Sequence, residues 1–216
     1  MLILRHLQRG VSLVELLVGL TIVAILLGTG VPSFFNWIQN TQIRTAAESI
    51  QSGLQLARSE AVRRNASIRF QLTDTMTSAC IVSAAGTNWV ISQDDLAGTP
   101  GACATAESES GTLRIIQKHA GTEGSTNIAV NATEDLVTPA TPGLPFNRPI
   151  IFNGLGKIPA PSITAGYNVS IGISNPSGGS CIDAGGKMRC LRVVVSTGGR
   201  IRMCDPSLAS SDPRAC

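Results

Sequence analysis

The sequence predicts an α+β protein in which a long N-terminal α-helix packs on a β-rich, disulfide-bonded globular head. Two patterns in the 216-residue chain predict this fold. An apolar run followed by a helical repeat of apolar residues occupies the N-terminal part, and short β-prone runs separated by Gly, Pro, Asn and Ser fill the rest. Six cysteines in a chain of this size are typical of disulfides in an exported protein.

The apolar run follows a short basic leader and carries no charged residue between Leu16 and Phe35. Twenty helical residues at about 1.5 Å each cover about 30 Å, the thickness of the hydrocarbon core of a bilayer. We therefore expect residues 11–39 to form a transmembrane helix. Because Arg5 and Arg9 precede the run, the positive-inside rule places the N-terminus in the cytoplasm and the head in the periplasm.

Glu15 is an acidic residue at the start of this apolar run. An isolated carboxylate in hydrocarbon costs about 2.5–3.5 kcal/mol on insertion scales, so it needs a partner. Cleavage after Gly10 would create an ammonium group on Val11, one helical turn from Glu15. That amine, in the same chain or in a neighbouring one, is a suitable counter-ion. An ordinary single-pass anchor would leave the positions of Glu15 and Gly10 unexplained.

The same residues carry a family resemblance. The prepilin motif of type IV pilins and type II secretion pseudopilins resembles residues 10–16, which read Gly-Val-Ser-Leu-Val-Glu-Leu, although Val11 stands where the family usually has Phe. The resemblance implies a type IV pilin-like fold with a leader peptide at residues 1–10. It also implies that a prepilin peptidase cleaves after Gly10 and methylates the amine of Val11, and that Glu15 acts in filament assembly.

Residues 40–66 are expected to continue the helix as an amphipathic half. Apolar residues recur there every three or four positions, which predicts one face packed on a β-sheet: Ile43, Ala47, Ile50, Leu54, Ala57 and Ala61. Residues 54–65 resemble the segment that marks the GspH/FimT branch of the pilin-like proteins.

The head, residues 67–216, is expected to consist of short strands. The β-prone runs lie at 67–72, 79–83, 89–92, 112–117, 127–130, 149–152 and 167–174. The last run alternates most regularly between apolar and small polar residues. Four prolines in residues 131–149 indicate a long loop. Residues 150–156, Ile-Ile-Phe-Asn-Gly-Leu-Gly, resemble the strand and turn of the GspH/FimT head domain.

Residues 189–204 predict a β-hairpin around Ser-Thr-Gly-Gly. A three-residue loop at 196–198 would place Cys190 opposite Cys204 and Arg192 opposite Arg202. This register favours a Cys190–Cys204 disulfide. Six cysteines allow 15 pairings, and the remaining pairs are expected to be Cys80–Cys103 and Cys181–Cys216.

The hairpin also gathers positive charge. Arg192, Arg200 and Arg202, with Lys187 and Arg189 nearby, predict a site for an anion, because guanidinium groups suit phosphates. Residues 199–202, Gly-Arg-Ile-Arg, resemble the Gly-Arg-x-Arg motif of FimT-type minor pilins, which implies binding of double-stranded DNA. Such binding would be non-specific and salt-sensitive. A solvated basic hairpin beside a disulfide is the alternative.

No catalytic site emerges, and no cofactor or metal is expected. His6 lies in the leader and His119 stands alone among polar residues, so no metal cluster or Ser-His pair can be assembled. The protein is therefore not expected to be an enzyme.

Three functions remain open. The leading one is a FimT/FimU-like minor type IV pilin that takes part in pilus assembly and in DNA uptake for natural transformation. The second is a GspH-type minor pseudopilin of a type II secretion system, and the third is a tethered periplasmic ligand-binding domain. The first two imply other pilins or pseudopilins, the prepilin peptidase and the bacterial inner membrane as partners, and the first adds double-stranded DNA.

Overall fold

The computed structural model describes all residues except 1–10, 94–102, 109–113, 125–126 and 137–142, together with the side chains of 29–33. The chain forms two compact units, Met1–Ile38 and Gln39–Cys216. The 52 residues of one helix, α1 (Leu13–Arg64), are divided between the two units.

In the first unit, α1 exposes its apolar side chains. Every Val, Leu and Ile side chain from Val11 to Leu27 is at least 52% exposed. The helix continues without interruption through Pro32 and reaches three aromatic side chains, Phe34, Phe35 and Trp37, of which Phe34 and Trp37 stack with ring centroids 5.9 Å apart. Within the part of the chain that the structure describes, no helix is long and apolar enough to cross a membrane.

In the second unit, α1 buries the apolar stripe predicted from the sequence. All six residues of the stripe are at most 2% exposed, from Ile43 to Ala61. Charged residues lie on the other face, where Arg44 and Glu48 form an i,i+4 ion pair of 2.8 Å. This part of α1 therefore has one buried apolar face and one charged face.

Two antiparallel sheets complete the second unit. The first, sheet A, has the order β3-β2-β1-β6 and contains β1 (Ile68–Thr73), β2 (Asn88–Gln93), β3 (Ile115–His119) and β6 (Ile150–Phe152). The second, sheet B, has the order β5-β4-β7-β8-β9 and contains β4 (Ala129–Leu136), β5 (Leu144–Pro145), β7 (Tyr167–Ser174), β8 (Leu191–Ser196) and β9 (Ile201–Cys204). Two short 3₁₀ helices, η1 (Pro176–Gly178) and η2 (Ile182–Ala184), connect β7 to β8.

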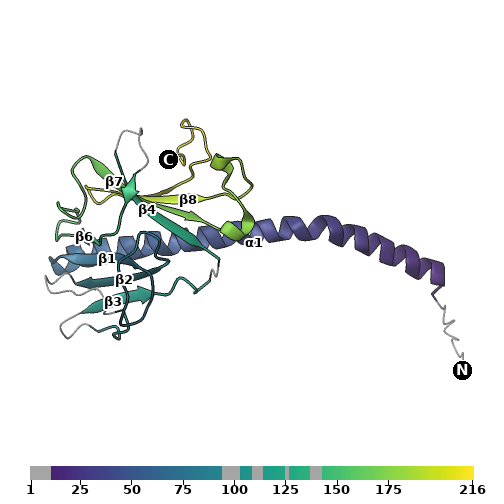
Figure 1. Ribbon diagram of the computed structural model, residues 1–216, viewed down its shortest axis with the longest axis horizontal. Helices are drawn as coiled ribbons and strands as arrows, with labels where there is room; N and C mark the ends of the chain where they lie inside the picture. The colour runs from purple at the N-terminus through teal and green to yellow at the C-terminus, as the bar shows by residue number, and fades with distance from the viewer. Residues whose placement is uncertain (1–10, 94–102, 109–113, 125–126, 137–142) are drawn as a thin grey trace, which may run out of the picture. The chain divides into compact units, whose positions relative to one another are not determined.

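Both sheets share one hydrophobic core with α1. In Figure 1, β2 and β3 lie below the second half of α1, and β4, β7 and β8 lie above it. Phe70 and Phe152 of sheet A and Ile171 of sheet B are among the largest fully buried side chains. The clean alternation expected in β7 is present, because Val169, Ile171 and Ile173 are at most 1% exposed. The α+β fold predicted from the sequence is confirmed.

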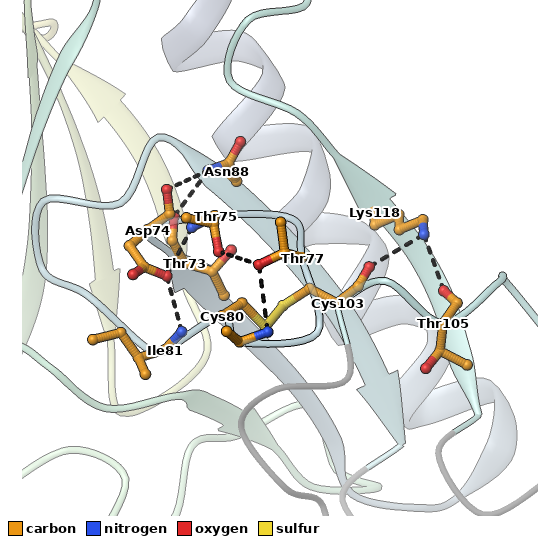
Figure 2. The surroundings of a disulfide bond; sticks show 11 residues. Thr73, Asp74, Thr75, Thr77, Cys80, Ile81, Asn88, Cys103, Thr105 and Lys118 are labelled. Carbon is orange, nitrogen blue, oxygen red and sulfur yellow. Dashed lines mark hydrogen bonds between the residues drawn. A yellow bond between two sulfur atoms is a disulfide. The ribbon is translucent and has the colours of Figure 1, made fainter.

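A disulfide covers the outer face of sheet A (Figure 2). Cys80 bonds to Cys103, the pair expected from the sequence, and both pack with Val90 and Ile115 in a second, smaller core. The ammonium of Lys118 donates hydrogen bonds to the carbonyls of Cys103 and Thr105 at 3.2 and 3.0 Å. The expected strand at 79–83 is instead a turn with one bridge, Thr73 to Val82, and the N–H of Ile81 bonds the side chain of Asp74 at 2.9 Å rather than a neighbouring strand.

The prediction of a long loop at 131–149 is also wrong for the first part of this segment. β4 continues to Leu136 and pairs along its whole length with β7. Val130, Ala132 and Glu134 are buried on the core side of the sheet, so β4 has the period of two that is typical of a strand. A loop is predicted for this segment from the sequence because of the prolines further along the chain. Residues 137–142 of the expected loop lie outside the described residues.

Candidate functional site

The candidate assembly site lies at the start of α1. Gly10 lies outside the described residues, and Val11, which is 70% exposed, precedes the first helical residue by two positions. Glu15 lies in the first turn of α1, where a carboxylate interacts favourably with the helix dipole, and it is exposed. Glu15 lies four positions after Val11, so an amine created at Val11 would lie close to this carboxylate in sequence, just before the helix begins.

The β8–β9 hairpin differs in register from the prediction by two residues. Arg192 lies opposite Cys204, and Val194 lies opposite Arg202, so Arg192 does not face Arg202. The turn is Thr197-Gly198-Gly199, because Gly199 takes the positive φ of +79° and the N–H of Ser196 still bonds the carbonyl of Arg200 at 3.0 Å. A shift of two residues keeps every side chain on its predicted face.

This register corrects two of the expected disulfides. Cys190 does not pair with Cys204, nor Cys181 with Cys216. Cys181 bonds to Cys190 across the loop that contains η2, with 5.5 Å between the Cα atoms, and Cys204 bonds to Cys216 at 5.0 Å. Cys190 lies outside the register in which β8 and β9 pair, and residues 205–216 fold back to bring Cys216 to β9.

Two of the five predicted DNA-binding cations are engaged inside the head. The Nε of Arg189 lies 2.5 Å from the carboxylate of Asp205, which is buried. Burial would raise the pKa of Asp205, but hydrogen bonds from Ser207 and Arg189 outweigh it and lower the pKa. The guanidinium of Arg202 donates to the carbonyls of Ala215 and Cys216 at 3.3 and 3.1 Å.

The other three cations keep their charge available. Within the described residues, the side chains of Lys187, Arg192 and Arg200 form no ion pair. Lys187 and Arg200 are exposed, and Arg192 is half-buried between Gly172 of β7 and Cys204 of β9. The register places Arg192, Arg200 and Arg202 on the outward face of sheet B, opposite the face of Val193 and Val195.

The tip of this hairpin meets two segments that are distant in sequence. We call this contact the tip junction and define it as Arg58, residues 153–158 and residues 197–199. The Nε of Arg58 donates to the carbonyl of Gly156 at 3.2 Å, and the N–H of Ile158 donates to the carbonyl of Thr197 at 2.9 Å. The Gly-x-Gly after β6 and the Gly-Gly of the hairpin are sequence signals for such a close backbone contact.

Comparison with known proteins assigns the chain. A family model described as type II transport protein GspH matches residues 46–199, which is most of the chain. The chain belongs to the GspH family. A second model, the prokaryotic N-terminal methylation motif, matches residues 5–31 of this GspH-family protein. No curated protein gives a significant match.

Solved structures of two other proteins are similar to this chain. The type IV minor pilin FimU of Pseudomonas aeruginosa is 18% identical in one crystal form, with 81% of this chain and 97% of FimU covered and a TM-score of 0.47. A second crystal form of FimU gives 17% identity, 78% and 97% coverage and a TM-score of 0.45. The solution structure of E. coli GspH gives 16% identity, 78% and 91% coverage and a TM-score of 0.39.

The family determines the general role of the protein. It is a pilin or pseudopilin of a type IV pilus or a type II secretion system, and such subunits assemble with other pilins. The family is structural rather than enzymatic. Among the residues that the structure describes, no three His, Cys, Asp or Glu side chains are grouped so that they could hold a metal ion.

Proposed function

We propose that this GspH-family protein is a minor type IV pilin of the FimT/FimU type. Prepilin peptidase would remove residues 1–10 and methylate Val11, and residues 11–39 would anchor the subunit in the inner membrane with the head in the periplasm. The match to the N-terminal methylation motif over residues 5–31 supports this processing. Disulfides between all six cysteines agree with a periplasmic head.

The observation that carries the assembly role is the exposed apolar start of α1 with one acid in it. Val and Leu side chains around Glu15 are more than half exposed, so this stretch needs an apolar environment. Glu15 would enter that environment only with a counter-ion. The amine of Val11 in a neighbouring subunit supplies one, so that assembly depends on cleavage after Gly10.

Mass spectrometry of the protein isolated from membranes tests the processing step. The mature chain is expected to begin at Val11 and to carry one additional methyl group. Gly10→Val should leave the chain uncleaved, because the bulky side chain would block the peptidase. An intact bond between Gly10 and Val11 in the wild-type protein would overturn the assembly role.

We propose further that the outward face of the β8–β9 hairpin binds the backbone of duplex DNA, with Arg200 and Arg192 as the main contacts and Lys187 at the margin. Arg202 and Arg189 would shape this surface through their bonds to residues 205–216. The exposed charge supports this role, and contacts to the phosphate backbone carry no sequence information, so the binding would be non-specific. Micromolar affinity is expected, on the order of other non-specific DNA binding.

The double variant Arg192→Gln with Arg200→Gln tests the DNA contact. Losing two phosphate contacts should reduce the slope of log affinity against log salt by about 2 and weaken binding at least tenfold. Fluorescence anisotropy of a labelled duplex measures both quantities. The control is Arg44→Gln with Arg114→Gln, which removes the same charge elsewhere on the head. Equal affinity of the two double variants for DNA would show that this hairpin does not bind DNA.

A GspH-type minor pseudopilin is the second candidate, and the description of the matching family model favours it. Deletion of the gene distinguishes the two candidates. A minor pilin should be needed for pili and natural transformation, whereas a pseudopilin should be needed for secretion of folded proteins. Nothing in the comparisons favours a tethered ligand-binding domain.

A further inference from the structure

We propose that the tip junction is part of the DNA-binding surface, and that Arg58 of α1 and Lys157 of the β6 turn contact backbone phosphates together with Arg200. This inference rests on the proposed DNA-binding function. It extends the contact from one hairpin to three segments and assigns a role to two cations outside the Gly-Arg-x-Arg motif.

A hydrogen bond to a backbone carbonyl holds the side chain of Arg58 beside Gly199, the residue before Arg200. The bond from Nε to the carbonyl of Gly156 orients the guanidinium and leaves its two terminal nitrogens for an external acceptor. A Cβ atom at Gly199 would lie 1.9 Å from the carbonyl oxygen of Gly156 and 3.3 Å from Nε of Arg58. The residue that follows Gly199 in the chain is Arg200, so the Nε of Arg58 lies beside the backbone that leads into Arg200.

Lys157 belongs to the same region and occupies a rigid turn. The side-chain oxygen of Asn153 accepts a hydrogen bond from the N–H of Lys157 at 3.0 Å. The N–H of Asn153 donates a hydrogen bond to the carbonyl of Lys157 at 2.9 Å. Gly156 and Ile158, on either side of Lys157, are buried, whereas Lys157 is exposed. The ammonium group is therefore directed outward from the junction.

The charge of these three side chains is not balanced inside the head. Within the described part of the chain, Arg58, Lys157 and Arg200 form no ion pair. The nearby carboxylate of Glu60 is shared by Arg63 and Arg64 at 2.6 and 2.7 Å, and these bonds lower its pKa, so it stays ionised and engaged. Arg44, on the same helix, is instead paired with Glu48.

The chemistry of the junction favours phosphate. A guanidinium presents paired donors that match phosphate oxygens, and three cations from separate segments suit a polyanion whose charges are repeated along a chain. Leu155 of the junction and Val62, which lies beside Gly156, are 75% and 53% exposed and would suit an acidic protein surface instead. The experiment below separates these two partners.

The test measures binding of the full chain, in detergent micelles, to labelled 30-bp duplexes of unrelated sequence. Arg58→Gln with Lys157→Gln should weaken binding at least tenfold and reduce the salt slope by about 2, as expected for two lost phosphate contacts. The matched control is again Arg44→Gln with Arg114→Gln. Arg58→Lys, which keeps the charge, and Lys157→Gln alone report on the junction if the double variant does not fold.

Each outcome has a distinct meaning. If the Arg58 and Lys157 variants bind like the control while the Arg192 and Arg200 variant loses affinity, the hairpin binds DNA and the junction does not. If wild-type protein binds no duplex, both proposals are overturned. If polyglutamate displaces the duplex at an equal concentration of charge, the surface fits an acidic protein rather than phosphate, and the inference is wrong.

Discussion

Replacing Gly199 by alanine should lower the free energy of unfolding by about 3 kcal/mol. The added Cβ would lie 1.9 Å from the carbonyl oxygen of Gly156, and Gly199 has a φ of +79°, which side chains rarely adopt. Neither strain can be relieved by moving a flexible side chain, because the atom that the Cβ meets belongs to the backbone. The hairpin tip would have to separate from residues 153–158, which would break the hydrogen bond from the N–H of Ile158 to the carbonyl of Thr197.

Thermal unfolding followed by circular dichroism measures this effect. A loss of about 3 kcal/mol corresponds to a decrease in Tm of roughly 6–12 °C for a protein of this size. Gly198→Ala is the matched control, because its Cβ would meet its nearest neighbour, the Oγ of Ser196, at 3.9 Å. A similar Tm for both variants would show that the contact between Gly199 and Gly156 contributes little to stability.

Replacing Glu15 by alanine should leave the protein in the membrane but exclude it from filaments. Removing the carboxylate makes membrane insertion easier, because the apolar start of α1 then carries no charge. In the filament, the amine of a neighbouring Val11 would remain buried without a counter-ion. Leaving one partner of a buried ion pair alone costs about 3 kcal/mol or more, and each 1.4 kcal/mol is about a factor of ten, so incorporation should fall about a hundredfold or more.

Quantitative immunoblots of sheared filaments and of membranes measure this ratio. Glu48→Ala is the control, because it removes a carboxylate from the exposed face of the same helix, where it pairs only with Arg44. Glu15→Asp should retain part of the incorporation, since the carboxylate is kept one methylene closer to the helix. Filaments that contain Glu15→Ala at wild-type levels would exclude an ion pair at this position from the assembly.

The helix and its buried stripe could be predicted because their signal is local. Apolar residues recur every three or four positions from Ile43 to Ala61, over about five helical turns. This spacing places them on one face of the helix, which is therefore buried. β7 was equally predictable from its alternation. β4 was not, because the prolines beyond Leu136 suggested a loop, although Ala132 and Glu134 already continue the inward face of Val130.

The hairpin register and the disulfides depended on information that the sequence does not carry locally. Two adjacent glycines could each have taken the positive φ, and the choice of Gly199 shifts the pairing by two residues without changing any face. Hydrophobic alternation cannot detect such a shift. The expected Cys190–Cys204 pair depended on the wrong register, and the expected Cys181–Cys216 pair could not form because Cys181 bonds to Cys190 and Cys204 to Cys216.

The basic surface was predicted in composition but not in arrangement. Arg189 and Arg202 are held by Asp205 and by the carbonyls of Ala215 and Cys216, in a segment whose return to β9 had no sequence signal. Arg58 lies 98 residues from Gly156 in sequence, so only the fold brings it to the hairpin tip. Two of the five cations that looked equally available in the sequence are therefore bonded within the head.

The connectivity of the disulfides has a consequence for biogenesis. Each bond joins cysteines that follow one another along the chain, Cys80 with Cys103, Cys181 with Cys190 and Cys204 with Cys216. An oxidase that links thiols in the order in which they leave the translocation channel would therefore produce the three native disulfides directly. Maturation of this head should need an oxidant but no isomerase to reshuffle wrong pairs.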